Sequence, residues 1–285
     1  PDWNDVQHQD WEDLRMAVYA AQVDRVDQGV GRIMDRLRET GEYDNTLFLF
    51  LSDNGGCAEL FQEDKDIPEP SIYSTPTVDG RRVTCGNIPS LRPGPDTTFM
   101  SYDLPWANVS NAPFRLFKSW MQEGGISTPF IIHWPDKIRQ PAINHSPMYI
   151  TDITATCIDA AGATYPTEFG GREITPIEGE SFLPIVEGRE WSREVPIFWE
   201  HEGNRAVRVG EWKLVSEFGL PWELYNMDED RTELNDLASG DGDRVQQMTQ
   251  IYEEWARRCQ VMPWPVDPRY LRGKYPTLGA HNYIA

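Results

Sequence analysis

Asp53 and Asn54 are the residues in this chain best suited to bind a metal ion. They follow the apolar run from Thr46 to Leu51 and are followed by Gly55-Gly56. Side-chain carboxylate and amide oxygens are the ligands that hard divalent cations prefer, and the two glycines let the backbone turn tightly. Asp-Asn-Gly is also ordinary turn chemistry, so these residues by themselves leave a plain strand-to-loop turn open.

Two further segments carry polar side chains that could act on an anion. Lys118 precedes Glu123-Gly124-Gly125, and His201 lies between Glu200 and Glu202, just before Asn204 and Arg205. A fixed ammonium can offset negative charge on a transferring group, and a histidine can handle protons or face an anion. Taken singly, a lysine beside aromatic residues is more often a surface side chain, and the His201 segment is equally consistent with a structural hairpin.

The order of these segments closely resembles the C-terminal half of the sulfatases, in the alkaline-phosphatase-like superfamily. The resemblance covers about residues 14–258. It rests on an ordered series of short segments: Val30-Gly31-Arg32-Ile33, Gly41 to Thr46, Ser52 to Gly56, Lys118, Glu123 to Pro129, Trp134-Pro135, Asp152-Ile153-Thr154, Glu200 to Arg205 and Glu223 to Asn226.

The resemblance implies a role for each matched residue. Asp53 and Asn54 would be two ligands of a single Ca²⁺, sometimes Mg²⁺, and Lys118 would bind the sulfate oxygens. His201 would face the substrate pocket, with Asn204 and Arg205 as substrate contacts. Two-metal phosphatase relatives place a histidine where Asn54 stands, so Asn54 favours a one-metal sulfatase. Many sulfatases carry an arginine where this chain has Ser127, which is a departure from the family pattern.

The nucleophile that the resemblance implies has no match in this sequence. Sulfatases act through a formylglycine made from the cysteine of C-x-[PA]-x-R, and none of Cys57, Cys85, Cys157 and Cys259 begins such a motif. The family's other metal-binding aspartates have no match either. We therefore expect half an active site, with the formylglycine and the remainder of the sulfatase chain upstream. A processed leader is the alternative explanation for the start at Pro1.

Composition limits the kinds of partner. The 285 residues carry a formal net charge of −20, which argues against nucleic acid or an anionic membrane as a partner. No apolar run approaches the about 20 residues of a membrane helix. The scattered cysteines leave the redox compartment open, whereas the family resemblance favours a periplasmic or secreted location.

The hydrophobic pattern predicts an α/β fold. Residues 10–40 form one apolar helical stripe that we expect to pack on a sheet, and the run from Thr46 is expected to be a strand buried on both faces, as in a parallel sheet. Pro129 to Trp134 predicts another strand, and Tyr149 to Ala161 predicts a helix. Together with the resemblance, this predicts part of an alkaline-phosphatase-like sandwich, the C-terminal part of its main sheet, over residues 1–193.

Residues 194–285 predict a smaller C-terminal subdomain. Short strand-like runs between 197 and 226 suggest an antiparallel meander, and residues 243–258 predict a helix; the tail from 263 is expected to be extended. In the first domain, the long segment 57–113 is irregular, and acidic residues near 63–69 suggest disorder. Its aromatic part, Phe99 to Asn108, is expected to fold over the Asp53 tip, with Trp106 or Asn108 contacting substrate; a loop packed elsewhere is the alternative.

These features favour a sulfuric ester hydrolase of the arylsulfatase type, acting on a small-molecule or glycan sulfate ester. Two alternatives stay open: a phosphatase or phosphonate hydrolase of the same superfamily, and a non-catalytic anion-binding relative. In either enzyme case, the chain by itself is expected to be inactive because it lacks the nucleophile.

Overall fold

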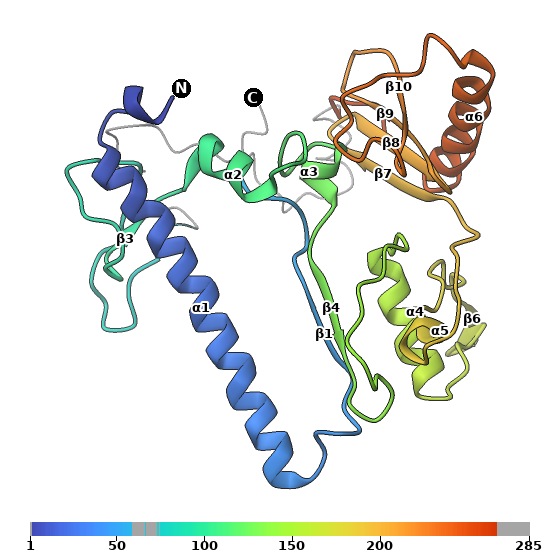
Figure 1. Cartoon of the computed structure of the whole chain (residues 1–285), viewed down its shortest axis with the longest axis horizontal. Helices are drawn as coiled ribbons and strands as arrows, with labels where there is room; N and C mark the ends of the chain where they lie inside the picture. Colours follow the sequence, from blue (N-terminus) through green and yellow to red (C-terminus); the bar gives the residue numbers. More distant parts are fainter. Residues whose placement is uncertain (1, 59–65, 67–72, 74, 267–285) are drawn as a thin grey trace. The chain divides into compact units, whose positions relative to one another are not determined.

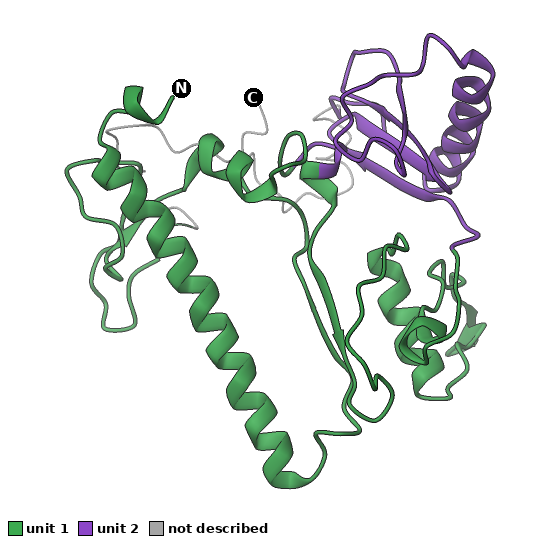
Figure 2. Ribbon diagram, in the orientation of Figure 1, with its two compact units in different colours: residues 1–118, 124–192 green, residues 119–123, 193–285 purple. Residues whose placement is uncertain are grey.

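The computed structural model describes residues 2–58, 66, 73 and 75–266. Two compact units are present: unit 1 consists of residues 1–118 and 124–192, and unit 2 of residues 119–123 and 193–285 (Figure 2). The expected disorder near residues 63–69 falls mostly outside the described residues, as does most of the extended tail. The helices that the structure describes are all too short or too polar to span a bilayer.

Unit 1 begins with the long helix α1 (Gln9–Thr40), which ends at Gly41 in a left-handed conformation with φ 75° (Figure 1). The helix is where the periodicity predicts it, but its packing differs from the expectation. Val23, Val26 and Ile33 in the predicted apolar stripe are 48–59% exposed. Near the N-terminal end of α1, Trp11 Nε1 donates to Leu91 O at 2.8 Å, and near its C-terminal end the Arg38 guanidinium lies 4.2 Å over the Tyr43 ring.

The strand that carries Asp53 and Asn54, β1 (Phe48–Leu51), pairs antiparallel with β4 (Phe130–His133) in a two-stranded sheet. Leu49 and Ile132 are opposite each other and pack towards a core around Phe182. The next pair, Phe50 and Ile131, points to the other face and is 42% and 58% exposed. The expectation of a parallel strand buried on both faces is therefore wrong for the described residues.

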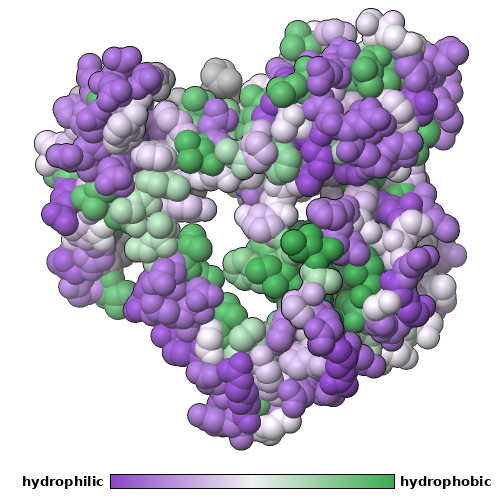
Figure 3. Space-filling view, viewed as in Figure 1, coloured by the Kyte–Doolittle hydropathy of each residue, from purple (hydrophilic) through white to green (hydrophobic). Residues whose placement is uncertain are grey.

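The hydropathy-coloured view shows hydrophobic residues on the face of the molecule that it presents (Figure 3). Strand side chains alternate between two faces, so Phe48 and Phe50 share one face of β1. That face is only partly covered: the Phe48 ring packs against Tyr43, with centroids 5.7 Å apart, whereas Phe50 is 42% exposed. The remaining elements of unit 1 are η1 (Trp3–Asp5), β2 (Thr84–Cys85), β3 (Thr98–Phe99), α2 (Asp103–Asn111), α3 (Glu123–Ile126, shared with unit 2 at Glu123), α4 (Ile150–Ala160), β5 (Glu168–Phe169), β6 (Arg172–Glu173) and α5 (Leu183–Val186).

Unit 2 is a four-stranded antiparallel meander covered by one helix. The strands follow the order β10-β9-β8-β7 in the sheet. Val207, Leu214 and Leu224 are buried against Met248 and Tyr252 of the helix. The elements are β7 (Ile197–His201), β8 (Asn204–Val209), β9 (Trp212–Ser216), β10 (Glu223–Asn226) and α6 (Gly242–Arg258). The predicted meander and helix are both confirmed. That the units correspond to a catalytic part and a subdomain stays a prediction.

Candidate functional site

The turn after β1 presents Asp53 and Asn54 away from the core. Asp53 is exposed, and its Oδ1 accepts the Asn54 backbone N–H at 3.0 Å. Asn54 Nδ2 donates to Gly55 O at 2.8 Å, so Oδ1 is the amide atom that a cation would meet. A carboxylate beside an amide oxygen fits Ca²⁺ or Mg²⁺ chemically. Within the described residues, no group of three or more acidic, His or Cys side chains could complete the ligation.

Gly55 must be a glycine because another backbone segment lies against it. Its N–H donates to Gly125 O at 2.9 Å, and a Cβ on Gly55 would lie 1.8 Å from Gly124 O. Gly124 is equally confined, since its own Cβ would lie 2.1 Å from Arg115 O. The Gly124-Gly125 segment therefore packs directly on the Asp53 turn, which explains why positions 55 and 124 are glycine.

Lys118 lies beside this turn. Its backbone N–H donates to Gly56 O at 3.0 Å, although the two residues are far apart in the sequence. Leu116 and Ser119, close to Lys118 on either side, have φ of 62° and 86°. Non-glycine residues rarely adopt this left-handed region, and such strain tends to persist where the surroundings fix the backbone. Unit 1 thus brings Lys118 together with the Asp53-Asn54 turn.

The aromatic stretch contacts the same turn, through residues other than those expected. A Cβ on Gly56 would lie 2.4 Å from the Tyr102 hydroxyl and 3.1 Å from Ala107 O. Trp106 itself packs against Trp3, with ring centroids 5.9 Å apart, and Asn108 is exposed. A substrate contact by Trp106 or Asn108 stays a prediction.

Asn111, at the end of α2, is a residue that the sequence analysis missed. Its Oδ1 accepts the Gly56 N–H at 2.8 Å, and its Nδ2 donates to Leu116 O at 3.0 Å. One amide therefore joins the Asp53 turn to the Lys118 loop. The sequence could have pointed to Asn111 only by residue type, since a helix-terminal asparagine is also common capping chemistry.

The other predicted site residues belong to unit 2. His201 is exposed at the β7–β8 turn, where Glu202 and Gly203 both have positive φ. The Asn204 amide bonds backbone groups within unit 2, Ser119 O at 3.2 Å and the Phe218 N–H at 2.9 Å. The Arg205 guanidinium stacks 4.2 Å over the Trp222 ring. Their convergence with Asp53 on one cleft stays a prediction.

A buried charge cluster in unit 2 fixes the segment that follows Lys118. Lys213 is fully buried, and its Nζ lies 3.0 Å from Glu123 Oε1 and 2.8 Å from Glu233 Oε1. Glu233 Oε2 also accepts the Glu123 backbone N–H at 2.7 Å. Burial opposes ionisation of Glu123, but Lys213 and Arg231 hold its pKa below the usual range. Burial raises the pKa of Glu233 despite Lys213.

Comparison with known proteins assigns the family. A model of the sulfatase family matches residues 3–163. The chain belongs to the sulfatase family. A second model, that of the C-terminal part of N-sulphoglucosamine sulphohydrolase, matches residues 114–260. Both matches include Lys118 and the Glu123-Gly124-Gly125 segment, which supports the resemblance on which the site prediction rests.

Among sulfatases, an uncharacterized one from Schizosaccharomyces pombe is 31% identical over 262 residues, covering 88% of this chain and 45% of the relative. The arylsulfatase of Klebsiella aerogenes is 31% identical over 183 residues, covering 64% of this chain and 37% of the relative. The chain therefore spans less than half the length of these curated relatives.

Solved structures support the fold. The structure of Ps i-CgsB in complex with k-i-k-neocarrahexaose gives a TM-score of 0.58 at 23% identity, covering 84% of this chain and 42% of that one. BT4656 in complex with D-glucosamine-2-N,6-O-disulfate gives 0.51 at 19% identity, covering 84% and 40%. The fold is thus the α/β fold of sulfatases, of the alkaline-phosphatase-like type.

Proposed function

We propose that this chain is the C-terminal part of a sulfuric ester hydrolase that cleaves R–O–SO₃⁻ to an alcohol and sulfate. The observation that carries the proposal is the Lys118 N–H bond to Gly56 O, which puts a lysine beside the Asp53-Asn54 turn. A cation site next to a lysine suits the sulfate of an ester, because both positive charges would offset negative charge on its oxygens. Family membership supports the same reaction.

The proposed reaction also needs a divalent metal ion and a formylglycine, neither of which is among the described residues. Ca²⁺, or Mg²⁺, would be held by the Asp53 carboxylate and Asn54 Oδ1, with further ligands from outside this chain. A metal there would polarise the sulfate, and a formylglycine upstream would supply the nucleophile. The Asn54 side chain favours a site with one metal ion over a site with two zinc ions, because it provides an oxygen ligand where zinc would prefer His or Cys.

The remaining roles fall to this chain's own residues. Lys118 would bind a sulfate oxygen and hold it against the Asp53 turn. Asn111 holds the Asp53 turn and the Lys118 loop together. His201 would handle the proton of the leaving alcohol, with Asn204 and Arg205 contacting the substrate beyond the sulfate. Trp106 and Asn108 would line the alcohol side. The substrate would be a small-molecule or glycan sulfate ester, and a periplasmic or secreted location follows from family resemblance only.

The test compares this chain with the same chain extended upstream through a C-x-[PA]-x-R segment, made in a host able to form formylglycine. Sulfate release from phenyl sulfate is measured with calcium present, and phenyl phosphate serves as the competing substrate. We expect turnover by the long form only, with phenyl sulfate preferred, because the short form lacks the nucleophile. An inactive long form would favour a non-catalytic anion-binding protein. A long form preferring phenyl phosphate would favour a phosphatase.

A further inference from the structure

The chain enters unit 2 for a short stretch between two parts of the candidate site. Residues 119–123, which we call the bridging segment, belong to unit 2, whereas Lys118 before them and Gly124 after them belong to unit 1 (Figure 2). Within the segment, Met121 to Glu123 are buried. Consecutive Cα atoms lie about 3.8 Å apart, so whatever fixes the bridging segment also limits where Lys118 and Gly124 can lie.

Two buried side chains of unit 2 bind the backbone of the bridging segment, one at each end. At its start, Asn204 Nδ2 donates to Ser119 O at 3.2 Å, and Asn204 Oδ1 accepts the Phe218 N–H at 2.9 Å. At its end, Glu233 Oε2 accepts the Glu123 N–H at 2.7 Å. Asn204 and Glu233 are 8% and 0% exposed, so these hydrogen bonds are shielded from water and strengthened by the low local dielectric.

A buried ammonium reinforces the end of the bridging segment. Lys213 is fully buried, and its Nζ lies 3.0 Å from Glu123 Oε1 and 2.8 Å from Glu233 Oε1. Lys213 thus joins the Glu123 side chain to the same Glu233 that holds the Glu123 backbone. Separating these groups would leave buried charge unpaired, which is strongly unfavourable. We call Asn204, Glu233 and Lys213 the clamp.

The residues next to the bridging segment support the turn after β1. Gly125, shortly after the segment, accepts the Gly55 N–H at its carbonyl oxygen at 2.9 Å. Lys118, directly before the segment, donates its backbone N–H to Gly56 O at 3.0 Å. Both hydrogen bonds lie within unit 1. The turn is therefore bonded to the backbone on both sides of the segment that the clamp holds.

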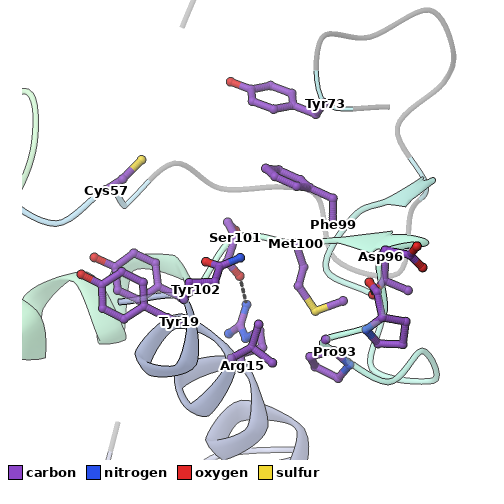
Figure 4. A pocket seen from close by; sticks show the side chains of 15 residues that line it. Arg15, Tyr19, Cys57, Tyr73, Pro93, Asp96, Phe99, Met100, Ser101 and Tyr102 are labelled. Carbon is purple, nitrogen blue, oxygen red and sulfur yellow. Dashed lines mark hydrogen bonds between the residues drawn. The ribbon is translucent and has the colours of Figure 1, made fainter. Parts of the chain in front are cut away.

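The Gly56 N–H, in contrast, is held by a side chain of unit 1. It donates to Asn111 Oδ1 at 2.8 Å. The Tyr102 hydroxyl occupies the space that a Cβ on Gly56 would need, and the Tyr102 ring stacks on Tyr19 of α1 with centroids 4.9 Å apart. These two rings line a cavity of about 480 Å³ beside α1 (Figure 4). The Gly56 N–H thus provides an internal reference for the two backbone bonds next to the bridging segment.

We propose that the clamp positions Lys118 and the Asp53-Asn54 turn relative to each other, so that both reach one bound sulfate. That these groups bind sulfate rests on the proposed function, whereas their positioning by the clamp does not. Glu233 and Lys213 act through the backbone and side chain of Glu123, so they are positioning residues. Loss of the clamp loosens the turn while unit 1 stays folded.

Amide hydrogen exchange of this chain, measured by NMR at a temperature where the variants are folded, tests the positioning without turnover. Glu233→Leu removes the acceptor of the Glu123 N–H, and Asn204→Ala removes the donor to Ser119 O. Leu224→Ala is the control, because Leu224 is fully buried in unit 2 and packs with residues of α6. The control also destabilises unit 2, since it deletes buried methyl groups.

We expect each clamp variant to loosen the end of the bridging segment that it held. The Glu233 variant should speed exchange of the Gly55 N–H about tenfold, and the Asn204 variant that of the Lys118 N–H, because each end loses one buried hydrogen bond. The Gly56 N–H should exchange as in wild type, and the control variant should leave all three amides unchanged. Equal acceleration by clamp and control variants, or none by either clamp variant, would overturn the proposal. Should Glu233→Leu not fold, Asn204→Ala decides the outcome.

Kinetics of the long form separate this proposal from the proposed function. Glu233→Leu should lower kcat for phenyl sulfate about tenfold with little change in KM, because misplaced groups stabilise the transition state less well, and Leu224→Ala should stay close to wild type. Faster Gly55 exchange in a long form without turnover would support the clamp and count against a sulfatase. An active long form in which Glu233→Leu behaves like Leu224→Ala in both measurements would overturn the clamp and leave the sulfatase standing.

Discussion

At the scale of single residues, Asn111 is the side chain that joins the two halves of the candidate site. Its amide satisfies the Gly56 N–H and Leu116 O, which belong to the metal-type turn and to the lysine loop. A buried backbone group that loses its partner costs about 1–3 kcal/mol. Asn111 therefore acts through Gly56 and Lys118 and is a positioning residue in the proposed reaction.

We predict that Asn111→Ala lowers the free energy of unfolding of unit 1 by about 1–3 kcal/mol, because two backbone groups lose their bonds. In the long form it should also lower kcat for phenyl sulfate more than it raises KM. The control is Asn45→Ala, since Asn45 is an exposed asparagine in the same unit and has no role in the proposed site. Denaturant unfolding and steady-state kinetics measure both effects. Equal behaviour of the two variants would contradict the positioning role.

Side-chain contacts such as those of Asn111 cannot be predicted from the sequence. Asp53, Asn54 and Lys118 are predicted as site residues because each matches a family landmark, and this stays a prediction. Asn111 and Lys213 were missed because their roles depend on partners distant in the chain, such as Gly56 and Glu123. One signal was available for Lys213: a lysine within an apolar strand-like run suggests a buried, paired ammonium.

At the scale of elements, the tip of β1 and the start of α3 approach so closely that both segments need glycine. We predict that Gly55→Ala destabilises the turn strongly, because its Cβ would lie 1.8 Å from Gly124 O. Gly31→Ala is the matched control: it lies within α1 with nothing within 4 Å of its Cβ. The control should stabilise the chain by about 0.5–1 kcal/mol through helix propensity. Thermal unfolding of the two variants in parallel tests this, and a tolerated Gly55→Ala would argue against so close an approach of the two backbones.

The buried charge cluster predicts a second effect at this scale. Lys213→Met leaves Glu123 and Glu233 without their shared ammonium, and removing one partner of a buried ion pair costs about 3–5 kcal/mol. Lys137→Met, at an exposed lysine, should change the free energy of unfolding by less than about 0.5 kcal/mol. Urea unfolding of unit 2, followed by tryptophan fluorescence, measures the difference. A Lys213→Met variant as stable as wild type would mean that the cluster is not closed in solution.

Element types were largely predictable, whereas their environments were not. The periodicity of α1 and α6 and the alternation in the meander identified these elements, because each pattern follows directly from helix or strand geometry. The apolar run of β1 was wrongly interpreted as buried on both faces, since apolar residues also occur on an exposed face, as Phe50 shows. Helix α2 was missed because Pro105 suggests a loop, although proline is tolerated in a first helical turn.

At the scale of the whole molecule, buried tyrosines should make stability fall at alkaline pH, since burial raises the pKa of Tyr102 and Tyr149 in unit 1 as well as that of Tyr252 in unit 2. Burial in the core of unit 2, reinforced by the negative charge of Glu200, raises the pKa of Tyr252 to about 12. The unfolded chain releases the same proton near pH 10, the ordinary range of tyrosine. Between these two pH values the unfolded state binds fewer protons than the folded state, so the stability of unit 2 falls as pH rises.

Tyr252→Phe should remove this loss, so that the variant keeps more of its neutral-pH stability than wild type at alkaline pH. Tyr165→Phe is the control, because Tyr165 is 38% exposed and lies in unit 1. Unfolding curves of the three proteins across the alkaline range give the comparison. Parallel loss of stability in wild type and Tyr252→Phe would show that another group governs the alkaline response.

The central claim is that the Asp53-Asn54 turn and Lys118 act on one sulfate group. A double-mutant cycle in the long form tests it most directly, with kcat/KM for phenyl sulfate measured for Asp53→Asn, Lys118→Met and the pair. Each single change should lower kcat/KM about 10²–10³-fold. The double variant should lose much less than the product of the two single losses, because both groups stabilise the charge of one sulfate. Asp53→Asn combined with Lys137→Met should show no such coupling. Two outcomes would contradict a shared sulfate site. In one, the losses in kcat/KM caused by Asp53→Asn and Lys118→Met multiply in the double variant. In the other, Lys118→Met is as active as Lys137→Met.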